Sequence, residues 1–345
     1  MTQDEAEGED WRSVSTRAPD AETIRAAQER ARKPGRGRSA DDPVQIPAPG
    51  WRDILTRVFW AVPQDRVLST AGSVAFFALL STFPGIATIV SLYSLVSDPA
   101  AIGQHLSVLN GVLPDGVLEL IAAQLKHVAE KGAGTLSTAS LISFLIAFWS
   151  ANSGVAALFD ALNVIYRERE KRDLVRVYLT TFLFTLGGAS VTVAAIATVV
   201  GLPYLLSQFG FGTGTDTLLR VMRWPALLVL VSLGLSLVYR YGPSRRTAKW
   251  RWVSWGSTVA ALGWIGTSTV FSLYVATFDS YNRIYGSLGA GIGFMTWIWL
   301  SVVIVLLGAE LNSEMERQTA RDSTVGSPKP LGSRRAFAAD TVGPP

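Results

Sequence analysis

Residues 177–206 read VYLTTFLFTLGGASVTVAAIATVVGLPYLL and contain no charged side chain. A helix rises about 1.5 Å per residue, so about 20 apolar residues cross the roughly 30 Å hydrocarbon core of a bilayer. This run exceeds that length. It predicts a membrane-spanning helix.

Five other stretches share this apolar character. The six predicted spans cover residues 67–97, 138–166, 174–206, 218–239, 252–278 and 288–311. The chain is 49% hydrophobic, with 11 Trp and only 17% charged residues, which is typical of a polytopic helical membrane protein. We therefore expect an all-α fold: a bundle of six transmembrane helices with short amphipathic helices.

The basic residues between the predicted spans alternate in number. Eleven precede the first span, and the following connections carry two, five, none, five and one, with five more in the C-terminal tail. Cytoplasmic segments of membrane proteins carry the excess of Lys and Arg. The alternation predicts both termini in the cytoplasm of a bacterium, with the chain in its inner membrane. Because the first 50 residues are polar, we expect no cleavable signal peptide, and the first span acts as a signal anchor.

The predicted organisation is one membrane domain between two tails. Residues 1–50 and 316–345 mix both charges with Pro and Gly, so we expect disordered cytoplasmic tails on either side of a transmembrane domain at 51–315. Apolar residues recur at helical spacing over 51–60 and 117–128, which predicts two amphipathic helices. The basic run at 30–38 is interpreted as solvated tail, with contact to anionic lipid as the alternative.

Polar residues occur inside the first two predicted spans. In span one, Thr82 and Pro84 lie near mid-depth, where Pro84 predicts a kink and, as an alternative, a gating hinge or substrate site. Span two carries Asn152, Asp160 and Asn163. Ionisable groups at membrane depth usually face the bundle interior or a water-filled cavity. Asp160 is interpreted as a structural partner of Arg167 or Arg240, or else as an acceptor of a proton or cation.

Two further polar groups lie near the ends of the last predicted span. Asp279, Tyr281, Asn282 and Tyr285 crowd a short Gly-rich connection, for which helix packing is the default and an external gate or headgroup site the alternative.

At the other end of that span lie Glu310 and Asn312. Asp160 is expected at a similar depth to Glu310, which suggests an acidic cytoplasmic vestibule ringed by Arg167, Arg169 and Arg240. The alternative is snorkelling of side chains at helix ends. The candidate headgroup-binding residues are Arg167, Arg169, Arg172 and Arg240.

The residue inventory argues against an enzyme. The chain has 2 His and no Cys, so it lacks the side chains for thiolate sites or disulfides, and we expect no metal site and no cofactor. It contains no Walker loop and no GxSxG motif. The net charge of +4 lies largely in the predicted cytoplasmic loops, which indicates anionic lipid headgroups rather than nucleic acid as a partner.

Four motifs in order give the chain a family resemblance: AGSVAFFALLSTFP (71–84), WSANSGVAALFDALNVIYRERE (149–170), WRWVSWGSTVAALGWIGTSTVFSLYV (250–275) and FDSYNRIYGSLGAGIGFMTWIWLSVVIVLLGAELN (278–312). From about Trp51 to Met315 the chain resembles the BrkB/YihY family of bacterial inner-membrane proteins. The resemblance implies six helices and an inner-membrane location, without a mechanism. Family members usually carry Pro where this chain has Trp255, a difference that alters the start of span five.

Two non-enzymatic functions remain. The favoured one is a transporter or lipid translocator for an anionic substrate or phospholipid. The alternative is a scaffold or envelope-integrity factor acting through membrane-protein partners or a second copy of the chain. Burial distinguishes them: a transporter should line one cavity with Asn152, Asp160 and Glu310, whereas a scaffold should bury these residues in pairs between helices.

Overall fold

The described part of the protein is helical. The structure, a computed structural model, describes residues 19–93, 138–196, 213–277 and 288–345. Over these ranges it contains helices and turns with a single isolated β-bridge, between Ala248 and Thr324. The predicted all-helical fold is therefore confirmed for the described residues.

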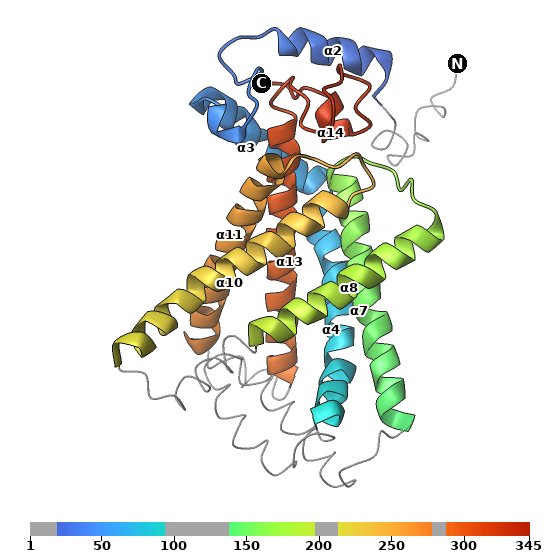
Figure 1. Cartoon of the computed structure of the whole chain (residues 1–345), viewed down its shortest axis with the longest axis vertical. Coiled ribbons are helices and arrows are strands. Elements are labelled where there is room, and N and C mark those ends of the chain that lie inside the picture. The colour runs from blue at the N-terminus through green and yellow to red at the C-terminus, as the bar shows by residue number, and fades with distance from the viewer. Residues whose placement is uncertain (1–18, 94–137, 197–212, 278–287) are drawn as a thin grey trace, which may run out of the picture.

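Six long helices form a bundle that opens at one end (Figure 1). They are α4 (Val67–Tyr93), α7 (Thr138–Ile165), α8 (Leu174–Ile196), α10 (Thr213–Tyr241), α11 (Trp250–Thr277) and α13 (Leu288–Glu316). Each falls on one of the predicted spans. Three of them, over 141–165, 174–191 and 291–316, are long and apolar enough to cross a membrane by length and composition. Crossing by all six remains a prediction.

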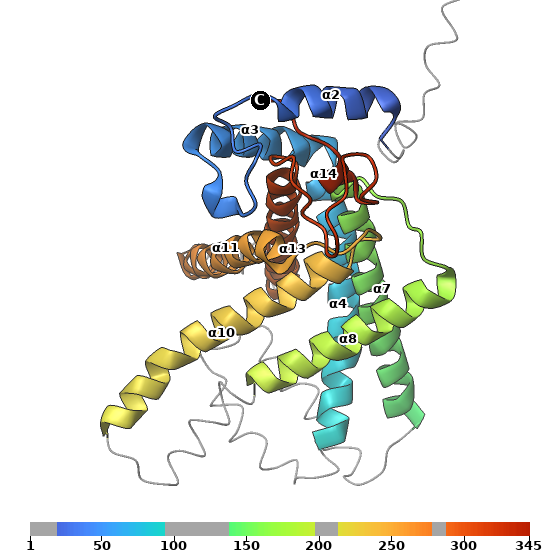
Figure 2. The same cartoon turned by 45° about the horizontal axis from the view of Figure 1, so that its top comes forward.

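The helices of the bundle pack unequally. α4 packs closely along α7, and α11 packs along α13, while α8 and α10 cross the bundle obliquely (Figures 1 and 2). Glycine permits the closest approach, where a Cβ on Gly256 of α11 would collide with the carbonyl oxygen of Gly308 on α13 and with the side chain of Asn312. Small residues at such crossings let helix backbones come together.

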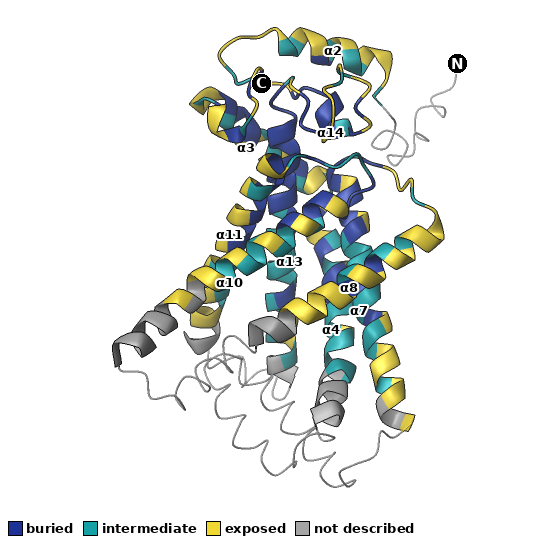
Figure 3. Cartoon of the chain, in the orientation of Figure 1, coloured by how far each residue is buried: buried dark blue, intermediate teal, exposed yellow. Residues whose placement is uncertain are grey.

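The outer faces of the bundle are apolar and exposed. On α8, Leu174, Val175, Tyr178, Leu179 and Leu183 are all exposed (Figure 3). Helix α4 continues through Pro84, so the helix is not broken at this residue. The predicted amphipathic helix at 117–128 lies outside the described residues.

Both ends of the described chain cover one end of the bundle. We call residues 19–66 and 317–345 the cap. It contains α2 (Ala21–Ala31), the 3-10 helix η2 (Pro43–Gln45), α3 (Ala48–Gln64) and α14 (Phe337–Asp340) (Figures 1 and 2). The connections after α7 and α10, which are rich in basic residues, lie at the same end. The described parts of the two tails, expected to be disordered, form helices and turns whose polar groups find partners in one another and in α13.

The cap is held by hydrogen bonds to main-chain carbonyl oxygens. Arg38 donates to the carbonyl oxygens of Gln318 and Gly343, at 3.1 and 2.9 Å. Arg334 donates to those of Lys329, Arg321, Ala339 and Ala320. A polar segment without apolar periodicity can fold when its backbone polar groups are satisfied in this way.

The amphipathic helix predicted at 51–60 is confirmed as part of α3, with a different division of its faces. Ile54 is fully buried, and Trp51 and Val58 pack beside it. Leu55 and Phe59, predicted on the same face, are 58% and 70% exposed. Trp51 also contacts Trp255, with ring centroids 6.1 Å apart, so the Trp that replaces the usual Pro joins α11 to the cap.

Candidate functional site

A pair of carboxyl groups lies where the cap meets the bundle. Asp65 ends α3, and Glu310 lies on α13 with only 1% of its surface exposed. The two carboxyl groups lie close enough to interact with each other directly. Oε1 of Glu310 has no hydrogen-bond partner among the described residues. The pair is thus a buried place where a proton can be held or released.

Arg167 supplies the positive charge beside this pair. It stands in the turn after α7 with φ +53°, in the left-handed region that side chains other than glycine rarely adopt. Burial raises the pKa of Asp65, while its interaction with Glu310 and the charge of Arg167 act in the opposite direction. Burial also lowers the pKa of Arg167 itself. Strained backbone and buried charged groups cluster at functional sites, so Arg167 and the carboxyl pair form a candidate site.

A second, tightly paired cluster lies next to the first. Arg57 of α3 donates to Glu314 Oε2 at 2.5 Å and to Gln318 Oε1 at 2.7 Å. Arg317 pairs with the other carboxylate oxygen of Glu314. All of these side chains are largely buried. Their mutual pairing gives them a structural role in closing the cap onto α13.

Asp160 lies elsewhere, on the exposed side of α7. Its charged neighbours are Glu170 and Arg172, whereas those of Glu310 include Asp65, Glu314 and Arg167. The two acidic residues of the predicted vestibule therefore have different charged neighbours. The described structure gives Asp160 no ion pair with Arg167 or Arg240, the partners considered from the sequence.

The four candidate arginines also divide between different surroundings. Arg167 lies beside the carboxyl pair, and Arg169 is exposed. Arg172 pairs with Glu170 at 2.7 Å and donates to the carbonyl oxygen of Gly242. Arg240 is buried, donates to the carbonyl oxygen of Ala248 and lies 4.6 Å from the ring centroid of Trp250. Its guanidinium thus holds the connection between α10 and α11 in place.

The three asparagines in the described spans act as contacts between segments. Asn163 accepts from the amide of Ser244 at 2.7 Å and donates to Glu170 at 3.1 Å. Asn312 accepts from the amide of Gly256 at 2.9 Å. Burial of polar groups with full hydrogen bonding stabilises one arrangement of the helices.

The contact made by Asn152 is weaker. Its side chain is half-buried and accepts from the hydroxyl of Thr185 on α8 at 3.3 Å. The hydroxyl of Thr82 donates to the carbonyl oxygen of Ala78 within its own helix, at 2.8 Å. These contacts do not test whether Asn152 and Thr82 line a substrate path, which stays a prediction.

Four predicted site residues cannot be placed. Asp279, Tyr281, Asn282 and Tyr285 lie outside the described residues. Sequence reasoning in turn missed Asp65 and Glu314. The signal for Glu314 was its position four residues after Glu310, on the same face of a helix that extends beyond the apolar stretch.

Comparison with known proteins agrees with the resemblance in the sequence. A family model described as virulence factor BrkB matches residues 58–331. A UPF0761 membrane protein of Cronobacter sakazakii is 30% identical over 77% of this chain and 91% of its own length. One from Alteromonas mediterranea is 29% identical over 78% of this chain and 89% of its own.

A Bacillus subtilis relative carries a different kind of name. It is described as a putative ribonuclease-like protein, YfkH, and is 29% identical over 72% of this chain and 90% of its own length. No solved structure matches the chain. With a family model covering most of its length and relatives named as membrane proteins, the chain belongs to the BrkB virulence-factor family of membrane proteins.

Proposed function

We propose that the protein is a non-catalytic transporter or lipid translocator that moves an anionic solute or phospholipid across the bacterial inner membrane. The observation that carries the proposal is the exposure of Asp160 on α7, within a helix apolar enough to cross a membrane. A charged side chain facing lipid tails is costly, so such a residue normally faces water or headgroups. Asp160 would then mark the side of α7 along which a polar group passes.

The orientation that we propose follows the basic residues, with the cap on the cytoplasmic side. Arg172 lies beside Asp160, and its charge is partly neutralised by Glu170. An arginine donates charge-assisted hydrogen bonds to a phosphate group, and Glu170 would compete with that phosphate for Arg172. The carboxyl pair of Asp65 and Glu310 would supply a proton site at the same membrane face, which suits coupling to proton movement.

The test is lipid translocation in proteoliposomes. Fluorescent phospholipids are scored for flip rate with wild type, Asp160→Asn, Glu310→Gln and empty vesicles. Asp173→Asn is the matched control, because Asp173 is exposed and forms a surface pair with Arg176. We expect flipping in wild type and the control, and impaired flipping with normal insertion in the two test variants.

Two outcomes would count against the proposal. Equal flipping in all variants would exclude Asp160 and Glu310 from the path. Flipping no faster than in empty vesicles would exclude lipid as the substrate, and uptake of soluble anions would then be measured with the same four proteins. Absence of both activities would reject transport.

A scaffold is the second candidate, and a specific observation favours it. Of the three residues that distinguish the two interpretations, Glu310 is buried between segments of this chain, as a scaffold would require, whereas Asn152 is half-buried and Asp160 is exposed. The exposed apolar face of α8 would then contact another membrane protein or a second copy. Cross-linking in native membranes tests this: a specific adduct through α8, lost when Leu179→Arg is introduced, would support the scaffold.

A further inference from the structure

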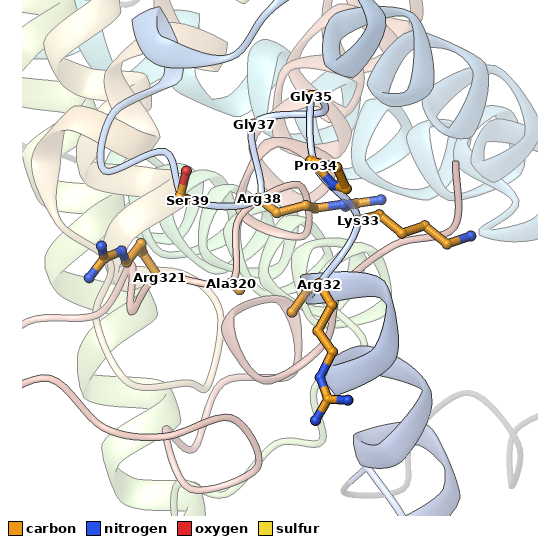
Figure 4. A pocket seen from close by; sticks show the side chains of 10 residues that line it. Arg32, Lys33, Pro34, Gly35, Gly37, Arg38, Ser39, Ala320 and Arg321 are labelled. Carbon is orange, nitrogen blue, oxygen red and sulfur yellow. The ribbon is translucent and has the colours of Figure 1, made fainter.

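A cavity with a basic lining lies in the cap, apart from the residues proposed for transport. Its volume is about 340 Å³, and it lies between the loop that follows α2 and the segment after α13. The charged residues that line it are Arg32, Lys33, Arg38 and Arg321, and none of its lining residues is acidic. Figure 4 shows Arg38 passing below Pro34, while the side chains of Arg32, Lys33 and Arg321 extend in three different directions.

The basic residues that line this cavity, Arg32, Lys33, Arg38 and Arg321, form no ion pair among the described residues. The adjacent Arg36, in contrast, is paired with Asp53 at 2.6 Å. Four cations around one cavity repel each other unless an anion lies among them.

Arg38 forms the fixed floor of the cavity. Only 5% of its surface is exposed, and its two terminal nitrogens donate to the carbonyl oxygens of Gln318 and Gly343. Its Nε has no hydrogen-bond partner among the described residues. Burial, followed by the charge of Arg57, lowers the pKa of Arg38 to about 10. The carboxylate of Asp53 acts in the opposite direction, but it is already paired with Arg36, so the guanidinium of Arg38 has neutral carbonyls as its direct partners.

The loop above Arg38 is built with glycines in the left-handed region. Gly35 and Gly37 have φ +76° and +77°. A Cβ on Gly37 would come within 3.1 Å of Pro47, whereas one on Gly35 would meet nothing within 4 Å. The loop is therefore packed on one side and open at Gly35, which leaves room at the cavity. The amide of Ala320 donates to the carbonyl of Arg38 at 2.8 Å and fixes the opposite wall.

We propose that this cavity binds a phosphate-bearing anion, with Arg38 as the fixed donor and Arg32, Lys33 and Arg321 closing on it from the rim. Phosphate oxygens accept charge-assisted hydrogen bonds from guanidinium N–H groups, and in Arg38 the N–H without a partner among the described residues is that of Nε. The source of the phosphate is either a soluble phosphorylated compound or a lipid headgroup. The proposal is independent of transport, since it concerns the cap alone.

Titration of the full-length protein in detergent micelles tests the site. Pyrophosphate and, separately, a short-chain phosphatidylglycerol are added, and binding is followed by calorimetry. Two variants remove the site: Arg38→Gln, and the double variant Arg32→Gln/Arg321→Gln, which changes only exposed residues and should leave the fold intact. Arg25→Gln is the matched control, since Arg25 is exposed on α2 and does not line the cavity.

We expect saturable binding in wild type and Arg25→Gln, weakened by added salt, and at least about tenfold weaker in both site variants. Binding of pyrophosphate identifies a soluble source, and binding of the lipid alone identifies a headgroup. Absence of binding by both probes would overturn the proposal. Equal affinity in wild type and the double variant would overturn it as well, whatever the fate of Arg38→Gln.

Discussion

The bundle and the cap are held together by different interactions. In the bundle, contacts between helices use glycines, apolar side chains and neutral hydrogen bonds such as the one from the amide of Gly256 to Asn312. At the end of the bundle that the cap covers, buried charged residues of α13 pair with residues of the cap and of the connection after α10. Arg245 and Glu316 form two hydrogen bonds, at 2.7 and 3.1 Å, with neither side chain exposed.

This difference follows from the solvent of each region. Helices that already lie in lipid gain little from bringing apolar faces together, so close packing and neutral polar contacts decide how they associate. The cap lies beyond the apolar stretches, where charged side chains remain accessible until the tails fold over them. The carboxyl pair of Asp65 and Glu310 lies at the boundary, and Asp160 is the exposed acidic residue of α7.

The largest effect is expected from breaking the buried ion pair between the connection after α10 and the end of α13. Arg245→Met leaves Glu316 buried without its partner, which costs on the order of 3–5 kcal/mol. Thermal unfolding in detergent, followed by tryptophan fluorescence, measures the loss. Arg176→Gln is the control, because its pair with Asp173 is exposed and is worth about 0–1 kcal/mol. An equal loss of stability in the two variants would contradict the conclusion that the buried ion pair contributes more than the exposed one.

A smaller effect is expected from separating two helices of the bundle. Gly256→Ala places a Cβ against the backbone of Gly308, so α11 and α13 must move apart, at a cost of about 1–3 kcal/mol. Gly266→Ala on the same helix meets nothing within 4 Å and should be neutral or slightly stabilising. The same unfolding assay compares them. If the first variant were as stable as the second, the close crossing would be disproved.

The connection after α7 should respond to pH. Burial acts to raise the pKa of Glu170, but hydrogen bonds from Arg172, Ser244 and Asn163 outweigh it and lower the pKa from 4.5 to about 2. The stability that ionised Glu170 provides is therefore present above pH 4.5 and is lost as the pH falls towards 2. The difference in Tm between wild type and Glu170→Gln should shrink from pH 7 to pH 3. A constant difference would show that ionisation of Glu170 is not its source.

The smallest effect is expected at the contact between α7 and α8. Thr185→Val removes the hydrogen bond from its hydroxyl to Asn152, and interhelical hydrogen bonds of this kind average about 0.6 kcal/mol. Thr181→Val is matched in burial but loses only a bond to its own helix, to the carbonyl of Tyr178. A larger loss of unfolding free energy in Thr185→Val than in Thr181→Val would support the contact between α7 and α8. Equal losses would show that the hydrogen bond to Asn152 contributes no stability.

The helices of the bundle were predictable from the sequence because membrane spans depend on length and composition alone. The alternation of basic residues also groups the connections after α7 and α10 with the termini, and these lie at one end of the structure. The six spans and the cytoplasmic location of that end remain predictions. Asn163 and Asn312 were recognised as polar residues in apolar helices, but their roles as contacts needed the structure.

The cap could not be predicted, because its stability rests on pairs of residues that are far apart in the chain. Arg38 bonds to residues 318 and 343, and Arg57 to 314 and 344. No local periodicity reports such partners, so the same composition also fits disorder. The vestibule was predicted from depth alone. Depth does not specify which side of a helix a residue occupies, and Asp160 and Glu310 consequently have different charged neighbours.

The proposed transport function requires that Asp160 faces water or headgroups and not lipid tails. The chain has no Cys, so single cysteines can be introduced and labelled without background. A methanethiosulfonate reagent reacts with the thiolate, which forms in water and not in hydrocarbon. The protein is reconstituted in vesicles, with Leu183→Cys on the exposed face of α8 as the lipid-facing control. We expect fast labelling of Asp160→Cys and slow labelling of the control; equally slow labelling of both would show that Asp160 faces lipid tails.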